Sequence, residues 1–452
     1  MKIIIVGDGK IGFALTERLA KDGHDIVVID RNPKVLAECQ QAADVMVVQG
    51  NGASMDVLKE AGIADAELLI AATSSDEINI LCCIMAGKLS NVHTIARVRS
   101  PEYFKQLNFL KEEMGLSMTF SPEFETALEI STLLQFPSFL KRDRFASGRV
   151  EIVEIKIAKS SVLCNQPLSK LYELVKVRVL VCAVERDGAA YIPSGSFILR
   201  ENDNIYVTAN SKYLTQLIKN LGLMRERIKN VMIIGGSRSA FYLATRLTNA
   251  GVGVTIVERS SERCSELASL LPKANVIEGD GSRRNVLDEE GIYTTDALVT
   301  LTDIDEENLI IALSAVQAGV PKVIAKVNRM EYIDTFRNMG VDTFINPKQL
   351  TCARVVRYVR AMGNTSGGSV QALHYIIGGK AEALEFIVNE RTRNRGIPLS
   401  QMHIRDNILI ASISRGSQII IPSGVDAFNI GDTVVVVTLV ENAIFDLNEI
   451  FT

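Results

Sequence analysis

Short apolar runs recur along the chain, and segments with helical spacing fill the intervals between them. The first set of runs falls at 2–6, 26–30, 45–48, 68–72, 92–98 and 117–120. A second set falls at 230–234, 254–257, 275–277, 297–301, 322–327 and 343–346. Short apolar runs that alternate with helices are typical of parallel strands covered on both faces. The pattern predicts an α/β fold with two tandem, doubly wound parallel sheets.

The two sets belong to one sequence repeat. Glycine turns begin at Gly7 and Gly235, and acids close the second strands at Asp30 and Glu258. Both spacings are 228 residues (235 − 7 and 258 − 30). The segment 73–79 matches 302–308 at a spacing one residue longer, 229 (302 − 73). Such long collinearity indicates a duplication.

Each copy is followed by a tail in which apolar and polar residues alternate. The alternating segments are 150–157, 177–184 and 204–208 in the first tail, and 383–388, 407–413 and 433–438 in the second. A polar stretch, 141–144, and a Gly/Ser-rich run, 363–369, precede the two tails. Alternation predicts strands, so each tail is expected to be a small, strand-rich α+β domain. The expected domains are 1–140, 145–222, 228–362 and 370–452.

One additional helix is predicted between each sheet and its tail, at 122–135 and 348–362. Either helix could pack on its own domain or exchange with a neighbouring subunit. The pattern of apolar residues favours neither alternative.

Composition excludes several classes of protein. The net charge of −4 provides no basic field for nucleic acid. Uninterrupted apolar stretches, such as Val434–Val437 before Thr438, are far shorter than the ~20 residues of a membrane span. Seven cysteines without a Cys-x-x-Cys motif favour a reducing compartment. The expected location is the cytoplasm, either free or peripherally docked on the inner face of the cell membrane.

The first glycine turn has the spacing of a dinucleotide-binding, Rossmann-like fingerprint. Gly7 permits the tight turn, Gly9 lets the backbone approach a pyrophosphate, and Gly12 allows the helix to pack closely on the strand. The helix that follows offers free N–H groups to the phosphates. Asp30 is expected to accept hydrogen bonds from a ribose 2′-hydroxyl. Its charge opposes a 2′-phosphate, so NADP is disfavoured although Arg31 follows.

Residues after the other strands are expected to converge on the same ligand, because ligands bind where the strand order reverses. Asn51 and Gly52 follow the third strand, Thr73 and Ser74 follow the fourth, and Arg97 ends the fifth. Thr73 has a second interpretation as a helix N-cap. Arg97 could equally be a solvated surface charge.

The second copy departs from the fingerprint. Ser237 replaces the middle glycine and Ala240 the last one. Alanine is tolerated at the last position, whereas serine places a side chain where a phosphate would approach. Arg238 could compensate as a phosphate ligand, and Glu258 keeps the ribose contact possible. Weaker or differently selective binding is expected here.

Catalytic groups and metal ligands are not evident. The four histidines, at 24, 93, 374 and 403, neither repeat nor cluster with carboxylates. A dehydrogenase needs a proton donor or acceptor beside the nicotinamide. The chain is therefore expected to be non-enzymatic.

The identity of the nucleotide stays open, because Asp30 cannot distinguish NAD from ATP or ADP.

With these residues in view, the chain resembles the regulatory subunits of Trk-type potassium uptake systems, which are built from domains that regulate potassium conductance (RCK domains). The resemblance covers essentially the full length. It rests on Gly7–Gly12 with Asp30, Gly50–Gly52, Thr73–Asn79, Ala96–Arg99 and both tails.

The resemblance implies a gating subunit that binds NAD(H) or adenine nucleotides. It also implies a ring, expected as a homotetramer, docked on a potassium-translocating membrane subunit of the TrkH/TrkG type. The implied first-copy ligands are Gly7, Asp8, Gly9, Lys10, Ile11, Asp30, Asn51, Gly52, Thr73, Ser74 and Arg97. The second-copy positions are Gly235, Gly236, Ser237, Arg238, Ser239, Glu258 and Thr302.

Two rival hypotheses remain. One is an NAD-dependent oxidoreductase with an unusual site, which hydride transfer to any substrate would reveal. The other is a nucleotide-sensing scaffold for a partner unrelated to transport, which co-purification with a membrane protein would argue against.

Overall fold

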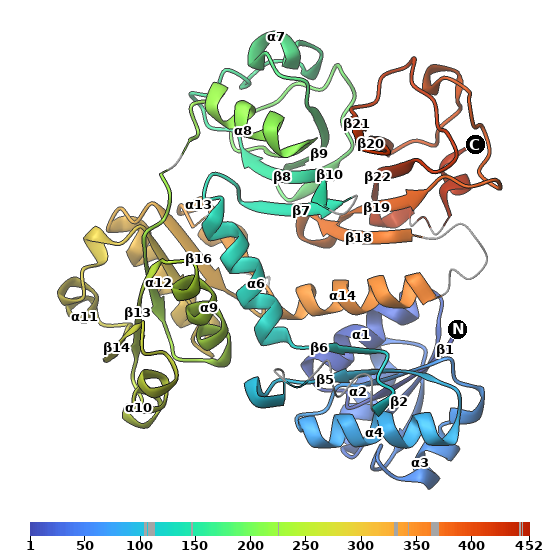
Figure 1. Ribbon diagram of the computed structural model, residues 1–452, viewed down its shortest axis with the longest axis vertical. Helices are drawn as coiled ribbons and strands as arrows, with labels where there is room; N and C mark the ends of the chain where they lie inside the picture. Colours follow the sequence, from blue (N-terminus) through green and yellow to red (C-terminus); the bar gives the residue numbers. More distant parts are fainter. Residues whose placement is uncertain are drawn as a thin grey trace.

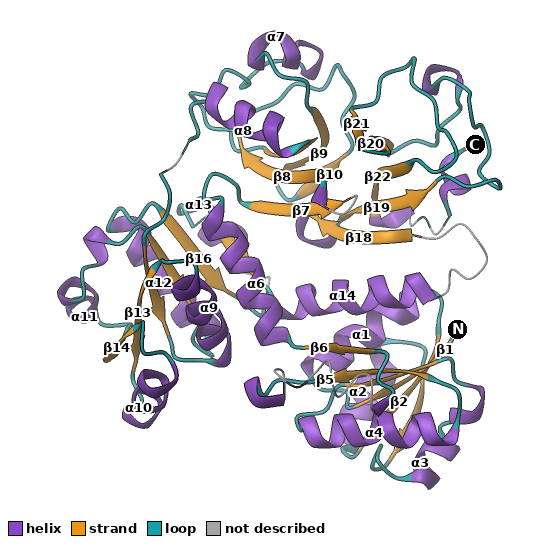
Figure 2. Cartoon of the chain, viewed as in Figure 1, coloured by secondary structure: helices purple, strands orange, loops and turns teal. Residues whose placement is uncertain are grey.

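The computed structural model describes residues 1–103, 106, 114–145, 148–224, 226–329, 333–341, 343–362, 370–442, 444 and 446–452. These residues form two parallel and two antiparallel sheets (Figures 1 and 2). The run 363–369 lies outside the described residues. Within the described part of the chain, no helix has the length and apolar character needed to cross a membrane.

The first parallel sheet has the strand order β3-β2-β1-β4-β5-β6. Its strands are β1 (Lys2–Val6), β2 (Asp25–Asp30), β3 (Met46–Gln49), β4 (Leu68–Ala71), β5 (His93–Arg97) and β6 (Met118–Phe120). The order reverses between β1 and β4, so the switch point lies at the turn that follows β1. The predicted doubly wound topology is confirmed.

Helices cover both faces of this sheet, which explains why its strands are apolar throughout. They are α1 (Lys10–Lys21), α2 (Pro33–Ala42), α3 (Met55–Glu60) and α4 (Asp76–Leu89). Alternate residues of β1 point to opposite faces. Ile3 and Ile5 pack in the core that contains Leu15 of α1, whereas Ile4 packs in the core that contains Cys83 of α4.

The second parallel sheet repeats the first, in the order β14-β13-β12-β15-β16-β17. Its strands are β12 (Asn230–Ile234), β13 (Gly253–Glu258), β14 (Asn275–Glu278), β15 (Ala297–Thr300), β16 (Lys322–Lys326) and β17 (Thr343–Ile345). Its helices are α9 (Arg238–Asn249), α10 (Ser261–Leu270), α11 (Arg284–Glu289), α12 (Asp305–Gln317) and α13 (Ile333–Asn338). The sequence repeat is therefore a repeat of structure.

Each tail contains a five-stranded antiparallel sheet. The first tail comprises β7 (Lys141–Phe145), β8 (Val150–Lys156), β9 (Leu180–Arg186), β10 (Ala189–Tyr191) and β11 (Asn204–Ala209), with α7 (Leu171–Val175) and α8 (Ser211–Asn220). The second comprises β18 (Val370–Ile376), β19 (Ala381–Ile387), β20 (Ile408–Arg415), β21 (Gln418–Ile420) and β22 (Thr433–Leu439). Both tails are strand-rich, as expected.

The polar stretch 141–144 differs from the expectation, because it forms the edge strand β7 and belongs to the first tail's sheet. Its charges are neutralised locally. The Arg142 Nε atom donates to Glu151 Oε2 over 2.9 Å, and the guanidinium lies 3.6 Å from the centroid of the Phe136 ring. Paired charges let this strand form without an alternating apolar pattern.

The two tail sheets pack face to face through small and β-branched residues. Ile152 of the first tail and Ala383 and Val435 of the second belong to one buried cluster. The edge strands β7 and β18 also meet, with Asp143 Oδ1 2.8 Å from His374 Nδ1. The two tails therefore form one packed unit, which lies above the parallel sheets in the view of Figure 2.

The two additional helices cross between the halves of the chain (Figure 1). Helix α6 (Pro122–Gln135) leaves the first sheet and packs on α9 of the second, where Ile130 joins the core of Leu243. Helix α14 (Pro347–Met362) leaves the second sheet and packs on α1 of the first, where Val359 joins the core of Leu19. Each helix thus completes the core of the other copy within the same chain, which corrects the alternative of packing on its own domain.

Candidate functional site

The glycine turns of the two copies face a single cavity of about 1200 Å³, here called the shared cleft. Residues of both turns line it: Asp8, Gly9, Lys10 and Ile11 from the first copy, and Gly236, Ser237, Arg238 and Ser239 from the second. Eight Lys or Arg residues and six Asp or Glu residues line the cleft. The excess of cations suits an anionic ligand.

The first turn has the geometry that a phosphate requires. Gly7 has φ +88°, and a Cβ atom there would lie 2.8 Å from Thr73. A Cβ atom on Gly12 would lie 1.9 Å from the carbonyl oxygen of Gly7, so the turn and helix α1 fit together only with glycine. A Cβ atom on Gly9 would meet nothing within 4 Å. The backbone at Gly9 therefore borders open space.

The N-terminus of α1 has no side-chain cap. Gly9 is the N-cap residue, and no side chain accepts a hydrogen bond from the first amides of the helix. The first N–H groups of a helix need partners, and phosphate oxygens are suitable ones. Lys10 is exposed and Ile11 is buried beside these amides. The first copy therefore presents a phosphate-binding terminus to the shared cleft.

Two backbone amides hold Asp30 at the base of this turn. Its Oδ2 atom accepts from Asp8 N over 2.9 Å, and its Oδ1 atom accepts from Asn32 N over 2.8 Å. The carboxylate is half-buried, and Arg31 beside it is exposed. This fixed carboxylate keeps lone pairs for a ribose hydroxyl, the role predicted for it.

Asp8 is a first-turn residue whose side chain has an internal partner. It is 3% exposed, and its Oδ1 atom accepts from Thr16 Oγ1 over 3.0 Å. Burial raises the pKa of its carboxyl group. Asp8 can offer a ligand its backbone, while its side chain fastens the turn to α1.

The residues after β3 and β4 do not appear among those that line the cleft. A Cβ atom on Gly52 would lie 2.2 Å from Val6, so Gly52 is needed for packing. Asn51 is exposed, and its Oδ1 atom accepts from Ala53 N. Ser74 is exposed as well. Their predicted ligand roles remain predictions.

Thr73 is engaged by a residue that the sequence analysis did not single out. Asn79 accepts from Thr73 N and Thr73 Oγ1, over 2.8 and 2.7 Å, and donates to the carbonyl oxygen of Arg97 over 3.0 Å. This fully buried amide joins the ends of β4 and β5. In the second copy, Asn308 likewise accepts from Thr302 N and donates to the carbonyl oxygen of Lys326. The sequence contained one indication of this role, namely that the asparagine recurs at the equivalent position of the second copy.

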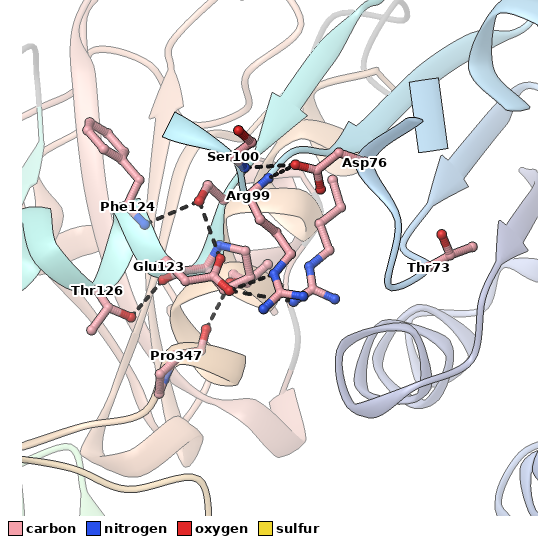
Figure 3. Close-up of polar contacts among 12 residues, drawn as sticks. Thr73, Asp76, Arg99, Ser100, Glu123, Phe124, Thr126 and Pro347 are labelled. Carbon is pink, nitrogen blue, oxygen red and sulfur yellow. Dashed lines mark hydrogen bonds and ion pairs between the residues drawn. The ribbon is translucent and has the colours of Figure 1, made fainter. Parts of the chain in front are cut away.

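The N-cap of α4 is Ser75, whose hydroxyl accepts from Ile78 N. The alternative interpretation of Thr73 as this cap is therefore wrong. Figure 3 shows Thr73 apart from the charged cluster of the cleft.

Arg97 lies inside the cleft wall and is not a solvated surface charge. Its side chain is 15% exposed, and its Nη2 atom lies 3.8 Å from Glu123 Oε1. Burial lowers the pKa of the Arg97 guanidinium. Arg99 Nε binds the same Glu123 oxygen over 2.9 Å (Figure 3). Two guanidinium groups thus converge on one carboxylate, and sequence reasoning identified only Arg97.

Asp76 fixes the backbone that carries the Arg99 side chain. Its Oδ2 atom accepts from the backbone N–H groups of Arg99 and Ser100, over 2.8 and 2.7 Å (Figure 3). These bonds fix the chain after β5, so the Arg99 side chain starts from a rigid backbone. Glu123 lies in the first turn of α6, the helix that crosses to the second copy.

The second turn satisfies its own hydrogen-bonding groups. Ser237 is the N-cap of α9, and its hydroxyl accepts from Ala240 N over 3.4 Å. Gly236 N donates to Glu258 Oε2 over 2.6 Å, and Gly236 O accepts from Arg263 Nε over 2.7 Å. The Gly236 bond repeats the Asp8–Asp30 bond of the first copy, whereas the capped amide of Ala240 differs from the uncapped start of α1. This cap is the structural reason to expect weaker binding in the second copy.

The remaining second-copy residues repeat the first-copy arrangement. Gly235 has φ +97°, and Ser239 is buried at the start of α9. Lys326 takes the place of Arg97, lies 3.6 Å from Asp303 Oδ1, and has its pKa lowered by burial. Arg238 and Arg97 line the same cleft. Both halves contribute cations to one ligand-sized space.

The family models match the two parallel-sheet regions and one tail. A TrkA-N domain model matches residues 3–122 and 231–347, and a TrkA-C domain model matches residues 152–222.

Among solved structures, the chain resembles the GsuK channel bound to NAD, with a TM-score of 0.61 at 17% identity. The match covers 97% of this chain and 77% of that chain. Another structure, of the GsuK channel, gives a TM-score of 0.63 over the same shares. At this identity the likeness establishes the fold, two tandem RCK-like units.

Two relatives match over nearly their whole length. The chain is 31% identical to Trk system potassium uptake protein TrkA homolog 1 of Methanosarcina mazei, covering 98% of both chains. It is 32% identical to Trk system potassium uptake protein TrkA of Haemophilus influenzae, covering 96% of this chain and 95% of that protein. Together with the domain matches, these similarities show that the chain belongs to the TrkA family of Trk system potassium uptake proteins.

Proposed function

We propose that the chain is a nucleotide-sensing regulatory subunit that controls potassium passage through a membrane partner. The observation that carries the proposal is the first glycine turn. Its uncapped helix N-terminus and its open backbone at Gly9 border a cleft rich in cations. Anionic nucleotides bind where free helix amides and positive charge coincide.

The first copy is the primary site in this proposal. The amides at the start of α1 hold the diphosphate, Asp30 holds the ribose, and Arg97 and Arg99 neutralise the phosphates. NAD(H), ATP and ADP all carry these groups. The GsuK structures are described as bound to NAD in one case and to ADP in another, which supports both ligand classes.

The second copy binds more weakly or not at all, because a ligand phosphate there must displace the Ser237 hydroxyl from the Ala240 amide. An N-cap of this kind contributes about 1 kcal/mol to its helix. The second site would therefore favour a ligand whose phosphate is a stronger hydrogen-bond acceptor for this amide than the Ser237 hydroxyl. The duplication can in this way report two different nucleotide levels.

Coupling to the rest of the chain runs through Glu123. Arg97 and Arg99 hold either this carboxylate or a ligand phosphate, since both compete for the same guanidinium groups. Release of Glu123 changes the hold on the N-terminus of α6, and α6 forms part of the second copy's core. Ligands that favour one arrangement over the other shift the balance between them.

The membrane partner is a potassium-translocating subunit of the TrkH/TrkG type, contacted from the cytoplasmic side by a homotetrameric ring of this chain. The names of the relatives in Methanosarcina mazei and Haemophilus influenzae, both potassium uptake proteins, support this assignment. A regulatory role is proposed in place of catalysis. None of the cleft-lining residues in the described part of the chain is a histidine or a cysteine.

Calorimetric titration with NADH, NAD, ATP and ADP tests the binding step. Asp30→Ala is expected to lose the tightest site, whereas Glu258→Ala, its matched control in the second copy, retains it. Equal loss in both variants would contradict the assignment of the first copy as the primary site. An absence of binding by the unmodified chain would overturn the proposal.

Potassium uptake in cells or vesicles that contain the partner tests the regulatory step. The double variant Gly9→Asp, Asp30→Ala is expected to abolish the response of flux to nucleotide. Unchanged nucleotide-dependent flux in a folded double variant would refute regulation through the first site.

A further inference from the structure

A second cavity, of about 520 Å³, lies where the two halves of the chain meet, away from both glycine turns. It is here called the junction cavity. Its walls come from α6, β7, α13, β17, α14 and β18, so both halves contribute to it. The proposed nucleotide function does not use this space.

Most charged side chains in its wall have a charged partner. Arg354 pairs with Glu125, which joins α14 to α6. Lys141 Nζ lies 3.3 Å from Asp143 Oδ2, and His374 Nδ1 lies 2.8 Å from Asp143 Oδ1. The Asp143–His374 contact ties β7 to β18, and together with Lys141 it uses both oxygens of Asp143.

Arg357 is different. It projects from α14 into the wall of the junction cavity and is half-buried. No hydrogen bond or ion pair joins it to another described residue, and its Nε atom is buried without a partner. Two acids act on its charge: Asp143, which Lys141 and His374 already neutralise, and Glu385 of β19. Charges that are partly withdrawn from water favour a partner of opposite sign, so this guanidinium can pair with an anion that enters the cavity.

His374 lies in the same wall and engages Asp143. Its Nδ1 atom lies 2.8 Å from Asp143 Oδ1, and its Nε2 atom is buried, so neither ring nitrogen is open to a ligand in the cavity. An anion in the cavity would therefore pair with Arg357.

Two acids in the wall, Glu129 and Glu154, bear on the charge of the cavity. Burial raises the pKa of both, to about 7 for Glu129. Near neutral pH they therefore oppose an anion less than two fully ionised carboxylates would. Arg337, opposite Glu154, pairs with Glu185 at 3.2 Å.

We propose that the junction cavity binds a small oxyanionic ligand, whose phosphate or carboxylate group pairs with Arg357. A planar guanidinium binds such groups through two parallel hydrogen bonds. The cavity is large enough for an organic anion that carries the group. Since α6, β7, α14 and β18 all contribute, occupancy holds the two halves in the arrangement described here.

Equilibrium dialysis of the full chain tests the proposal, with radiolabelled inorganic phosphate and labelled citrate as separate probes. Saturating NADH fills the shared cleft, and chloride keeps the ionic strength constant. One saturable site per chain is expected for at least one probe. Arg357→Gln should weaken it about tenfold or more, the loss of one charge-assisted interaction. Arg357→Lys should recover part of the affinity.

Two controls keep the test decisive. Arg178→Gln removes an exposed arginine of the first tail and should leave probe binding unchanged. NADH affinity should be the same in Arg357→Gln as in the unmodified chain, which also shows that the variant is folded. The proposal is overturned if neither probe shows a saturable site with NADH present. It is equally overturned if Arg357→Gln binds as tightly as the unmodified chain.

Discussion

Replacing Ile130, a residue of the first copy, by alanine should destabilise the second copy. Ile130 belongs to the first half of the sequence, yet its side chain is fully buried in the core of the second parallel sheet. The substitution removes three carbons, worth about 0.8 kcal/mol each on transfer from water. With the cavity that remains, the expected loss is about 3–4 kcal/mol, within the range for such truncations.

Hydrogen–deuterium exchange locates the effect. Amides of α9 (Arg238–Asn249) should exchange faster in Ile130→Ala, because α6 packs directly on this helix. Amides of β1 (Lys2–Val6) should keep their protection. The mirror variant, Val359→Ala on α14, should reverse the pattern and expose α1 (Lys10–Lys21), since Val359 is fully buried against the first copy. Urea denaturation measures the size of each loss.

The reasoning fails if Ile130→Ala increases exchange in β1 and leaves α9 protected. It also fails if Ile130→Ala and Val359→Ala both affect only the half that contains the changed residue. Either result would mean that α6 and α14 pack on their own sheets in solution.

Three further perturbations have defined outcomes. Gly12→Ala should lower the free energy of unfolding by about 1–3 kcal/mol and abolish nucleotide binding, because its Cβ atom would lie 1.9 Å from the Gly7 carbonyl oxygen. Thermal unfolding and calorimetry measure the two effects, and an unchanged melting temperature would contradict the clash. Burial raises the pKa of Glu129 from 4.5 to about 7, so its contribution to stability is complete below pH 4.5 and is lost as the pH rises to about 7. Denaturation across this pH range should show that Glu129→Gln removes the loss. A variant with the same pH profile as the unmodified chain would refute this assignment. Lys322→Met should lower the free energy of unfolding, measured by urea denaturation, by about 1–3 kcal/mol. The reason is that the buried ammonium donates to the Phe139 carbonyl oxygen over 2.9 Å and so holds the chain after α6. An unchanged free energy of unfolding would show that water replaces this contact.

The strands of both parallel sheets were predictable because each is buried on two faces and must be apolar along its length. Strand β7 was not, because Glu151 neutralises the charge of Arg142 and no apolar alternation is needed. The sequence predicted helices α6 and α14 but not their partners. An apolar stripe such as that of Ile130 shows that a helix is buried, without indicating which surface covers it.

The site was predictable to a similar extent. The glycine spacing identified the first turn, because few other residues tolerate the φ of Gly7 or the close contact at Gly12. Arg99 and Glu123 were missed, since their role depends on α6 starting beside the end of β5. Asn79 was missed because a buried amide and an exposed one look the same in a single sequence. Contacts between distant segments require the fold.

The contact between Asp143 and His374 has a consequence for how such molecules can diversify. The two residues hold the same place in their tails: they lie opposite Ile152 and Ala383, and both pairs are 231 residues apart (374 − 143 and 383 − 152). In a symmetric dimer of single units, a residue on the two-fold axis meets its own copy, and an acid there would face an acid. Joining the units in one chain lets each axial position mutate independently, so a self-repelling pair can become an acid and a base.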